Sequence, residues 1–181
     1  MLVFSKGMAT LLVSLMATVV LPTWVSASSF SGSGTLTSAN LAFNSAVGAW
    51  GCSATTLEVA AVAGGASATV NAASATGCTG TAGALNTCEM PYTFTGLPWR
   101  MTALDPLVID GIHIVVGPMT GVTCAAVGTN LTFDGSLGGG VYTHANRTLV
   151  FTNAEGLTVA GVGIFTVNGD FRTDGTFTFA T

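Results

Sequence analysis

An aspartate and a histidine three residues apart are the first candidates for catalysis in this chain. Asp110 and His113 lie in its most apolar segment, Leu107 to Val116. A carboxylate beside a histidine orients the imidazole for general-base work, but a nucleophile must then come from elsewhere in the chain. The sequence has no Gly-x-Ser-x-Gly motif to supply one. We predict that Asp110 and His113 are surface residues, and a secreted hydrolase is an alternative hypothesis.

Two tryptophans could serve as platforms for a ligand. Trp50 lies two residues before a cysteine, and Trp99 follows Leu97-Pro98. Because a tryptophan ring buries a large apolar area, packing against the core is its commoner role. We predict core packing for both rings, with ligand binding by Trp50 or Trp99 as the alternative.

The acidic segment from Asn168 to Gly175 raises the question of a calcium site. If Asp170 is aligned with the first position of an EF-hand loop, Arg172 falls on the third ligand position and Thr181 replaces the bidentate glutamate. Tight Asn-Gly and Asp-Gly turns explain the segment better. The cysteines also lack the Cys-x-x-Cys spacing of a zinc site. We therefore predict no metal and no cofactor.

Four cysteines in an exported chain predict two disulfides, with three possible connectivities. The segment between Cys52 and Cys78 is typical of a hairpin that turns near Gly64-Gly65. A three-residue turn places Cys52 opposite Cys78, whereas a two-residue turn shifts the register by one residue. We favour Cys52–Cys78 with Cys88–Cys124 by elimination, and the alternative is Cys78–Cys88 with Cys52–Cys124.

The elements that carry these residues are predicted to be strands. Apolar and polar residues alternate with period two along the chain, as in Tyr92 to Thr95 and Leu131 to Phe133. Apolar residues on one face and threonines on the other are typical of an antiparallel sheet with one solvated face. Turn residues such as Gly117-Pro118 and Asp174-Gly175 separate the segments. We predict an all-β fold: a single antiparallel β-sandwich or barrel of about nine strands, stapled by its disulfides.

One glycine decides which way the candidate catalytic residues point. Strict alternation places Asp110 on the same face as Ile112 and Ile114. A one-residue bulge at Gly111 removes this conflict, and glycine is the residue expected at a bulge. With the bulge, Asp110 and His113 face outward and the inner face is formed by Leu107, Ile109, Ile112, Ile114 and Val116.

Residues 1–27 have the three parts of a secretory signal peptide. Lys6 gives a positive region, Leu11 to Leu21 an apolar region, and Val25-Ser26-Ala27 a cleavage site. We predict a mature protein of residues 28–181, a single β domain that is secreted, extracellular or associated with the cell envelope. Stable membrane insertion after cleavage is not expected. Four basic residues in 181 are too few to bind nucleic acid.

The order of several short motifs resembles a group of exported, Thr- and Gly-rich β-proteins of unknown function from actinobacteria. The motifs in this sequence are Cys78-Thr79-Gly80, Leu97-Pro98-Trp99, Tyr142-Thr143 with Asn146, and Asn168-Gly169-Asp170. The resemblance implies export and β-structure and assigns no active residues. This chain differs from the group in having Cys88 in an insertion and in lacking a late cysteine near Asn-Gly-Asp.

These observations favour a function that does not involve catalysis. The leading hypothesis is a secreted structural or interaction protein of the cell surface or envelope, with an unknown partner. The first alternative is a carrier of a small apolar ligand in a barrel or sandwich cleft, and the second is the hydrolase. An apolar pocket of about 300–1,000 Å³ would favour the carrier. A serine and an oxyanion donor beside His113 would favour the enzyme.

Overall fold

The computed structural model describes residues 28–121, 124, 130–160 and 162–180, so the predicted signal peptide and its predicted cleavage site lie outside the described residues. Strands are the only regular elements of the described chain. They are β1 (Ser29–Ser38), β2 (Leu41–Ser45), β3 (Gly48–Gly65), β4 (Ser67–Gly83), β5 (Tyr92–Thr95), β6 (Trp99–Thr102), β7 (Leu107–Val116), β8 (Leu131–Thr143), β9 (Thr148–Val159), β10 (Gly163–Thr173) and β11 (Thr178–Ala180).

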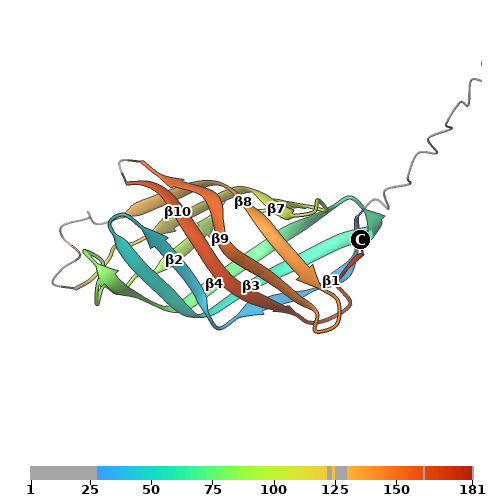
Figure 1. Cartoon of the computed structure of the whole chain (residues 1–181), viewed down its shortest axis with the longest axis horizontal. Coiled ribbons are helices and arrows are strands. Elements are labelled where there is room, and N and C mark those ends of the chain that lie inside the picture. The colour runs from blue at the N-terminus through green and yellow to red at the C-terminus, as the bar shows by residue number, and fades with distance from the viewer. Residues whose placement is uncertain (1–27, 122–123, 125–129, 161, 181) are drawn as a thin grey trace, which may run out of the picture.

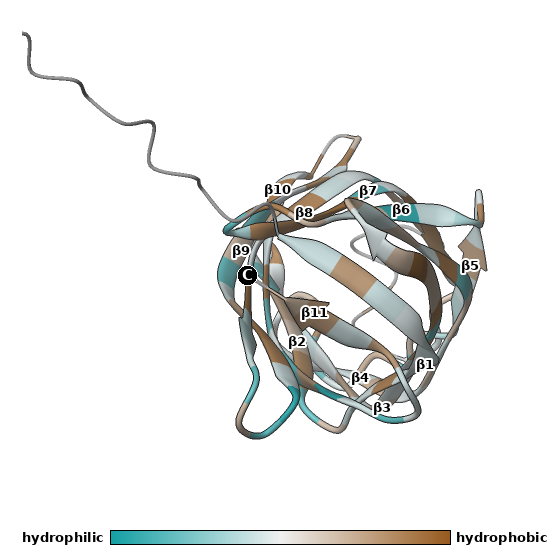
Figure 2. Cartoon of the chain, turned by 90° about the vertical axis from the view of Figure 1, so that its right-hand side faces the viewer, coloured by the Kyte–Doolittle hydropathy of each residue, from teal (hydrophilic) through white to brown (hydrophobic). Residues whose placement is uncertain are grey.

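All the strand pairs are antiparallel, and the sheet closes on itself. Neighbouring strands follow the order β10, β2, β3, β4, β6, β7, β8 and β9, and β9 pairs in turn with β10. Figure 1 shows the elongated shape, and Figure 2, turned by 90°, shows the ring of strands. The all-β prediction is confirmed, and closure of the sheet corresponds to the barrel rather than the sandwich.

The described residues form eleven strands, more than the predicted number of about nine, because two places in the ring each hold two strands. β1 and β2 both lie between β3 and β10. β5 and β6 both pair with the same edge of β7. At each of these two places, an interruption of the strand gives two strands where one long strand would otherwise run.

The core lies inside the ring and consists of the inward side chains of every strand. Phe30, Phe133, Phe151 and Phe165 are each at most 1% exposed. Phe133 and Phe165 meet edge to face, with ring centroids 4.9 Å apart. Because alternate residues of a strand point to opposite faces, the period-two pattern of the sequence builds this core directly.

Both preferred disulfides are present. Cys52 on β3 bonds to Cys78 on β4, its register partner, and Cys88 bonds to Cys124. The β3–β4 hairpin contains both of the pairing registers considered above, one near the turn and the other near the cysteines. Ala61 pairs with Ala68 near the turn, and a shift at Glu58 brings Cys52 opposite Cys78 farther along. A bulge inside the strands, rather than the turn alone, therefore sets the cysteine pairing.

The prediction that Asn168-Gly169 forms a turn is wrong. Both residues lie within β10, where the register with β9 shifts between Val167 and Gly169. The predicted turn at Asp174-Gly175 is correct: Gly175 has a φ of 78°, and its N–H donates to Asp174 Oδ1 at 2.7 Å. An Asn-Gly pair within a strand occupies a bulge here instead of reversing the chain.

Candidate functional site

The bulge in β7 directs His113 out of the core, as predicted. Gly111 has a φ of 74°, and the register with β8 shifts between Ile109 and Ile112. Ile109 and Ile112 are 2% and 5% exposed, whereas the side chain of His113 is 40% exposed. The left-handed backbone at Gly111 is therefore what separates the apolar side chains of β7 from its polar ones.

The carboxylate that contacts His113 is Asp134 rather than Asp110. His113 on β7 is the register partner of Asp134 on β8, and its Nδ1 contacts Asp134 Oδ1. Asp110 lies on the other side of the bulge, where its register partner is Arg100 on β6. The sequence did not indicate Asp134, because the two residues of the pair come from different strands.

A carboxylate on Nδ1 leaves Nε2 of the imidazole free to act as a base. The His113–Asp134 pair therefore has the base and the orienting carboxylate of a catalytic triad, which also needs a nucleophile. The threonines beside this pair do not supply the nucleophile. Thr95 Oγ1 donates to the main-chain carbonyl of His113 at 3.4 Å, and Thr158 Oγ1 donates to that of Asp134 at 3.2 Å. Both hydroxyls therefore hold the strands together instead of facing the ring of His113.

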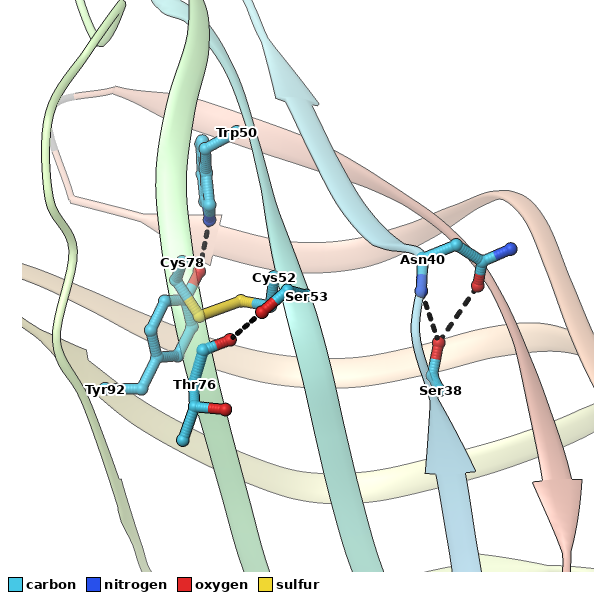
Figure 3. The surroundings of a disulfide bond; sticks show 8 residues. All are labelled: Ser38, Asn40, Trp50, Cys52, Ser53, Thr76, Cys78 and Tyr92. Atoms are coloured by element: carbon cyan, nitrogen blue, oxygen red, sulfur yellow. Dashed lines mark hydrogen bonds between the residues drawn. A yellow bond between two sulfur atoms is a disulfide. The ribbon is translucent and has the colours of Figure 1, made fainter.

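The two tryptophans lie in the core. Trp50 is 1% exposed, its ring stacks on Phe43 at 5.1 Å, and its Nε1–H donates to the hydroxyl of Tyr92 (Figure 3). Trp99 is 3% exposed and donates to the carbonyl of Thr95 at 3.0 Å. Neither ring is an exposed platform, although Trp99 lines the interior of the ring.

Tyr92 keeps its proton because burial raises the pKa of its hydroxyl well above the ordinary value. The hydrogen bond from Trp50 acts in the opposite direction and is the smaller influence. The neutral hydroxyl of Tyr92 accepts a hydrogen bond from the indole N–H of Trp50, and both aromatic rings pack at the same end of the core. This contact is structural, since both side chains point inward.

Two polar residues of the segment considered for calcium, Asn168 and Asp170, are hydrogen-bonded to other parts of the protein. Asp170 Oδ1 accepts a hydrogen bond from Asn40 Nδ2, and Asn168 Oδ1 accepts one from the N–H of Asn153 at 2.8 Å. Within the described residues, no group of three or more His, Cys, Asp or Glu side chains is placed to hold a metal ion. These side chains join β10 to its neighbours on both sides.

A broad outer surface of small hydroxyl-bearing side chains covers β1, β3 and β4. Register partners form rows across these strands, with Thr37 beside Thr56 and Thr56 beside Ser74. Glu58 is the charged residue within the rows. We call this surface the hydroxyl face and define it as Ser33, Thr35, Thr37, Thr56, Thr69 and Ser74.

The interior of the ring contains a cavity of about 50 Å³ with an apolar lining. Drug-sized ligands occupy pockets of about 300–1,000 Å³. The cavity is therefore too small for a ligand of the size considered for a carrier.

Comparisons with known proteins give no relative for this chain: no protein-family model, curated protein or solved structure matches it. Within the described residues, no helix has the length and apolar character needed to cross a membrane.

Proposed function

We propose that this protein is an exported, non-enzymatic structural or interaction protein of the cell surface or envelope. The observation that carries the proposal is the hydroxyl face. It lies on β3 and β4, the longest strands at 18 and 17 residues, and on the neighbouring β1. Long paired strands give an extended surface, and short side chains keep that surface even.

The chemistry of the hydroxyl face suits an uncharged partner. A Ser or Thr hydroxyl can donate and accept hydrogen bonds, so it matches the hydroxyl and amide groups of neutral polymers. Thr37 and Thr69 already donate to main-chain carbonyls, so these two offer a partner their acceptor sites. A charged partner would be recognised mainly through clusters of Arg or Lys, or of Asp or Glu. Glu58 is the charged residue in the rows of this face. We therefore place the contact with a neutral, hydrogen-bonding component of the envelope.

The surroundings of His113 support a role without catalysis. The hydroxyls of Thr95 and Thr158 already donate to main-chain carbonyls, so neither hydroxyl donates to the imidazole of His113. The His113–Asp134 pair is also solvent-exposed, with side-chain exposures of 40% and 59%. Catalytic groups usually lie in pockets that exclude water.

Two features support export. Disulfides persist in oxidising compartments outside the cytosol, and the protein has two. The resemblance to exported Thr- and Gly-rich actinobacterial proteins also favours this location. A surface of Ser and Thr hydroxyls keeps a sheet soluble with few charges, which suits an exported protein that contacts a neutral surface.

Charge introduced on the hydroxyl face tests the proposal. Ser33, Thr69 and Ser74 are exposed, so replacing all three with lysine should leave the fold intact while disrupting contact with a neutral surface. We expect the wild-type protein to sediment with cell envelopes from the producing organism. The triple variant should bind them at least about tenfold more weakly, as three desolvated charges would cost more than 1.4 kcal/mol in total.

The matched control places the same charges on the other side of the ring. Thr93, Thr132 and Thr152 are exposed residues of β5, β8 and β9. Their triple lysine variant should sediment with envelopes as the wild type does. Equal binding by the two variants would show that the hydroxyl face is not the contact surface. Absence of wild-type binding would refute the proposed interaction itself.

A further inference from the structure

The few charged side chains of this protein gather beside the hydroxyl face. Of the twelve charged residues in the chain, all except Lys6 lie in the described part, which therefore holds eleven. Four of these eleven line two neighbouring surface hollows: Arg147, Asp170, Arg172 and Asp174. Two positive and two negative side chains leave this region neutral overall. A chain that has little charge elsewhere therefore concentrates opposite charges at one place on its surface.

The two hollows form one groove along the border of the hydroxyl face. One hollow, of about 420 Å³, lies over β1, β3 and β10, and the other, of about 390 Å³, lies over β1, β10 and the turn from β8 to β9. Both are lined by Thr37 and Arg172, which are register partners on β1 and β10. The larger hollow also includes Thr56. Thr37 and Thr56 belong to the hydroxyl face, so the groove continues that face.

The two carboxylates of the groove are each held in place by one oxygen. Asp170 Oδ1 accepts a hydrogen bond from Asn40 Nδ2, and Asp174 Oδ1 accepts one from the N–H of Gly175 at 2.7 Å. Both aspartates are exposed, and the second oxygen of each makes no hydrogen bond within the described residues. Each carboxylate therefore offers a ligand an oriented acceptor.

The two arginines supply donors beside these acceptors. Arg147 Nη2 donates to the carbonyls of Gly175 and Phe177, at 2.8 and 3.2 Å, and these bonds fix its guanidinium at one end of the groove. Arg172 is exposed, and its guanidinium makes no hydrogen bond or ion pair with the part of the chain that the structure describes. A guanidinium carries several N–H donors and no acceptor. Arg172 therefore places an unused donor group where the two hollows meet.

Donors and acceptors held side by side select a ligand that both donates and accepts. Hydroxyl groups do both, and two hydroxyls on adjacent carbons of a sugar ring match the paired N–H groups of a guanidinium. A polyanion meets Asp170 and Asp174 in the groove, and a polycation meets the two arginines, so neither gains a net attraction. The mixed charges therefore favour a neutral ligand with many hydroxyls.

We infer that this groove binds a neutral polysaccharide whose sugar rings carry hydroxyls on adjacent carbons, with Arg172 as the central contact. The inference rests on the proposed function and names the chemical class of the envelope partner. Each hollow lies within the range of about 300–1,000 Å³ that is usual for small-molecule sites, so each has room for a sugar ring. The adjoining hydroxyl face extends the contact along the polymer.

Chemical treatment of envelopes from the producing organism tests the ligand class. Periodate cleaves the bond between adjacent carbons that both carry hydroxyls, and a broad protease removes polypeptides. After periodate treatment and borohydride reduction, we expect envelopes to bind the wild-type protein at least about tenfold more weakly, because the hydroxyl pairs that bond to the groove are destroyed. Protease-treated envelopes should bind as untreated ones do. Unchanged binding after periodate, or loss of binding after protease alone, would overturn the inference.

A pair of matched arginine variants tests the site. Arg172→Ala should bind untreated envelopes about tenfold more weakly, the value of one charge-assisted hydrogen bond. Arg100→Ala removes an exposed arginine of β6, outside the groove, and should bind as the wild type does. Because both arginines are exposed, both variants should keep the wild-type melting temperature within about 2 °C. Wild-type affinity in Arg172→Ala, or an equal loss in Arg100→Ala, would overturn the assigned site.

Failure of this inference is distinguishable from failure of the proposed function. The triple lysine variant of Ser33, Thr69 and Ser74 changes the hydroxyl face and none of the residues that line the groove. If that variant loses envelope binding while periodate and Arg172→Ala have no effect, the proposed function stands and the polysaccharide site is refuted. If the wild-type protein does not sediment with untreated envelopes, the proposed function is refuted, and this inference with it.

Discussion

Replacing Ile112 with alanine is expected to lower the free energy of unfolding by about 2–5 kcal/mol, because it empties a site in the core. Ile112 is 5% exposed and lies directly beside His113 on β7. Replacing His113 with alanine should change the same free energy by less than about 0.5 kcal/mol, the usual range for a surface substitution. Its contact with Asp134 is exposed to solvent, and exposed contacts of this kind contribute little to stability.

Urea denaturation of the wild type and the two variants measures this difference between neighbouring residues. A larger loss for His113→Ala than for Ile112→Ala would contradict the bulge at Gly111 and the face assignment that depends on it. The same His113 variant tests the hydrolase alternative. Esterase or glycosidase activity that is present in the wild type and lost in His113→Ala would show that the protein is an enzyme.

Removing the Cys88–Cys124 disulfide is the second change with a large expected effect. Replacing both cysteines with alanine should lower the free energy of unfolding by about 2–5 kcal/mol, because the cross-link restrains the unfolded chain. Its sequence separation of 36 residues exceeds the 26 of Cys52–Cys78. The region around Cys88 also lies outside the long strands. Glu89 forms isolated bridges with Thr79 of β4 and with Thr120, which lies beyond the end of β7.

The Cys52–Cys78 disulfide provides the comparison. Its two cysteines are register partners within the β3–β4 hairpin, where backbone pairing continues on both sides of the cross-link. Replacing this pair with alanine should therefore cost no more than replacing the other pair. Urea denaturation of both double variants under non-reducing conditions gives the ranking. A larger loss from the hairpin variant would show that the ladder depends on its cross-link.

The alternation of apolar and polar residues along a strand was enough to predict the features that depend on which face a side chain occupies. The bulge at Gly111 followed from the need to place Asp110 outside and Ile112 inside, and the structure confirms it. The pairing of Cys52 with Cys78 followed from their matching positions in one hairpin. Gly111 lies within the strand whose alternation it changes, and the two cysteines lie in one hairpin, although the register shift at Glu58 that brings them opposite each other was not predicted.

Features that depend on contacts between distant strands could not be predicted in this way. Asp134 lies opposite His113 because β7 and β8 pair in one particular register. Asn168-Gly169 continues a strand because β9 and β2 both pair with β10. Both features arise from pairing between strands that are distant in the sequence, and at Asn168-Gly169 this pairing overrides a local turn preference.

We propose above all that this chain acts outside the cytosol as a surface protein that contains two disulfides. Fractionation of the producing organism, followed by N-terminal sequencing and non-reducing peptide mapping, tests it most directly. We predict that the protein is recovered from the envelope or the medium, begins at Ser28, and gives linked peptides containing Cys52–Cys78 and Cys88–Cys124. Recovery from the cytosol with Met1 retained and all four cysteines reduced would contradict the claim.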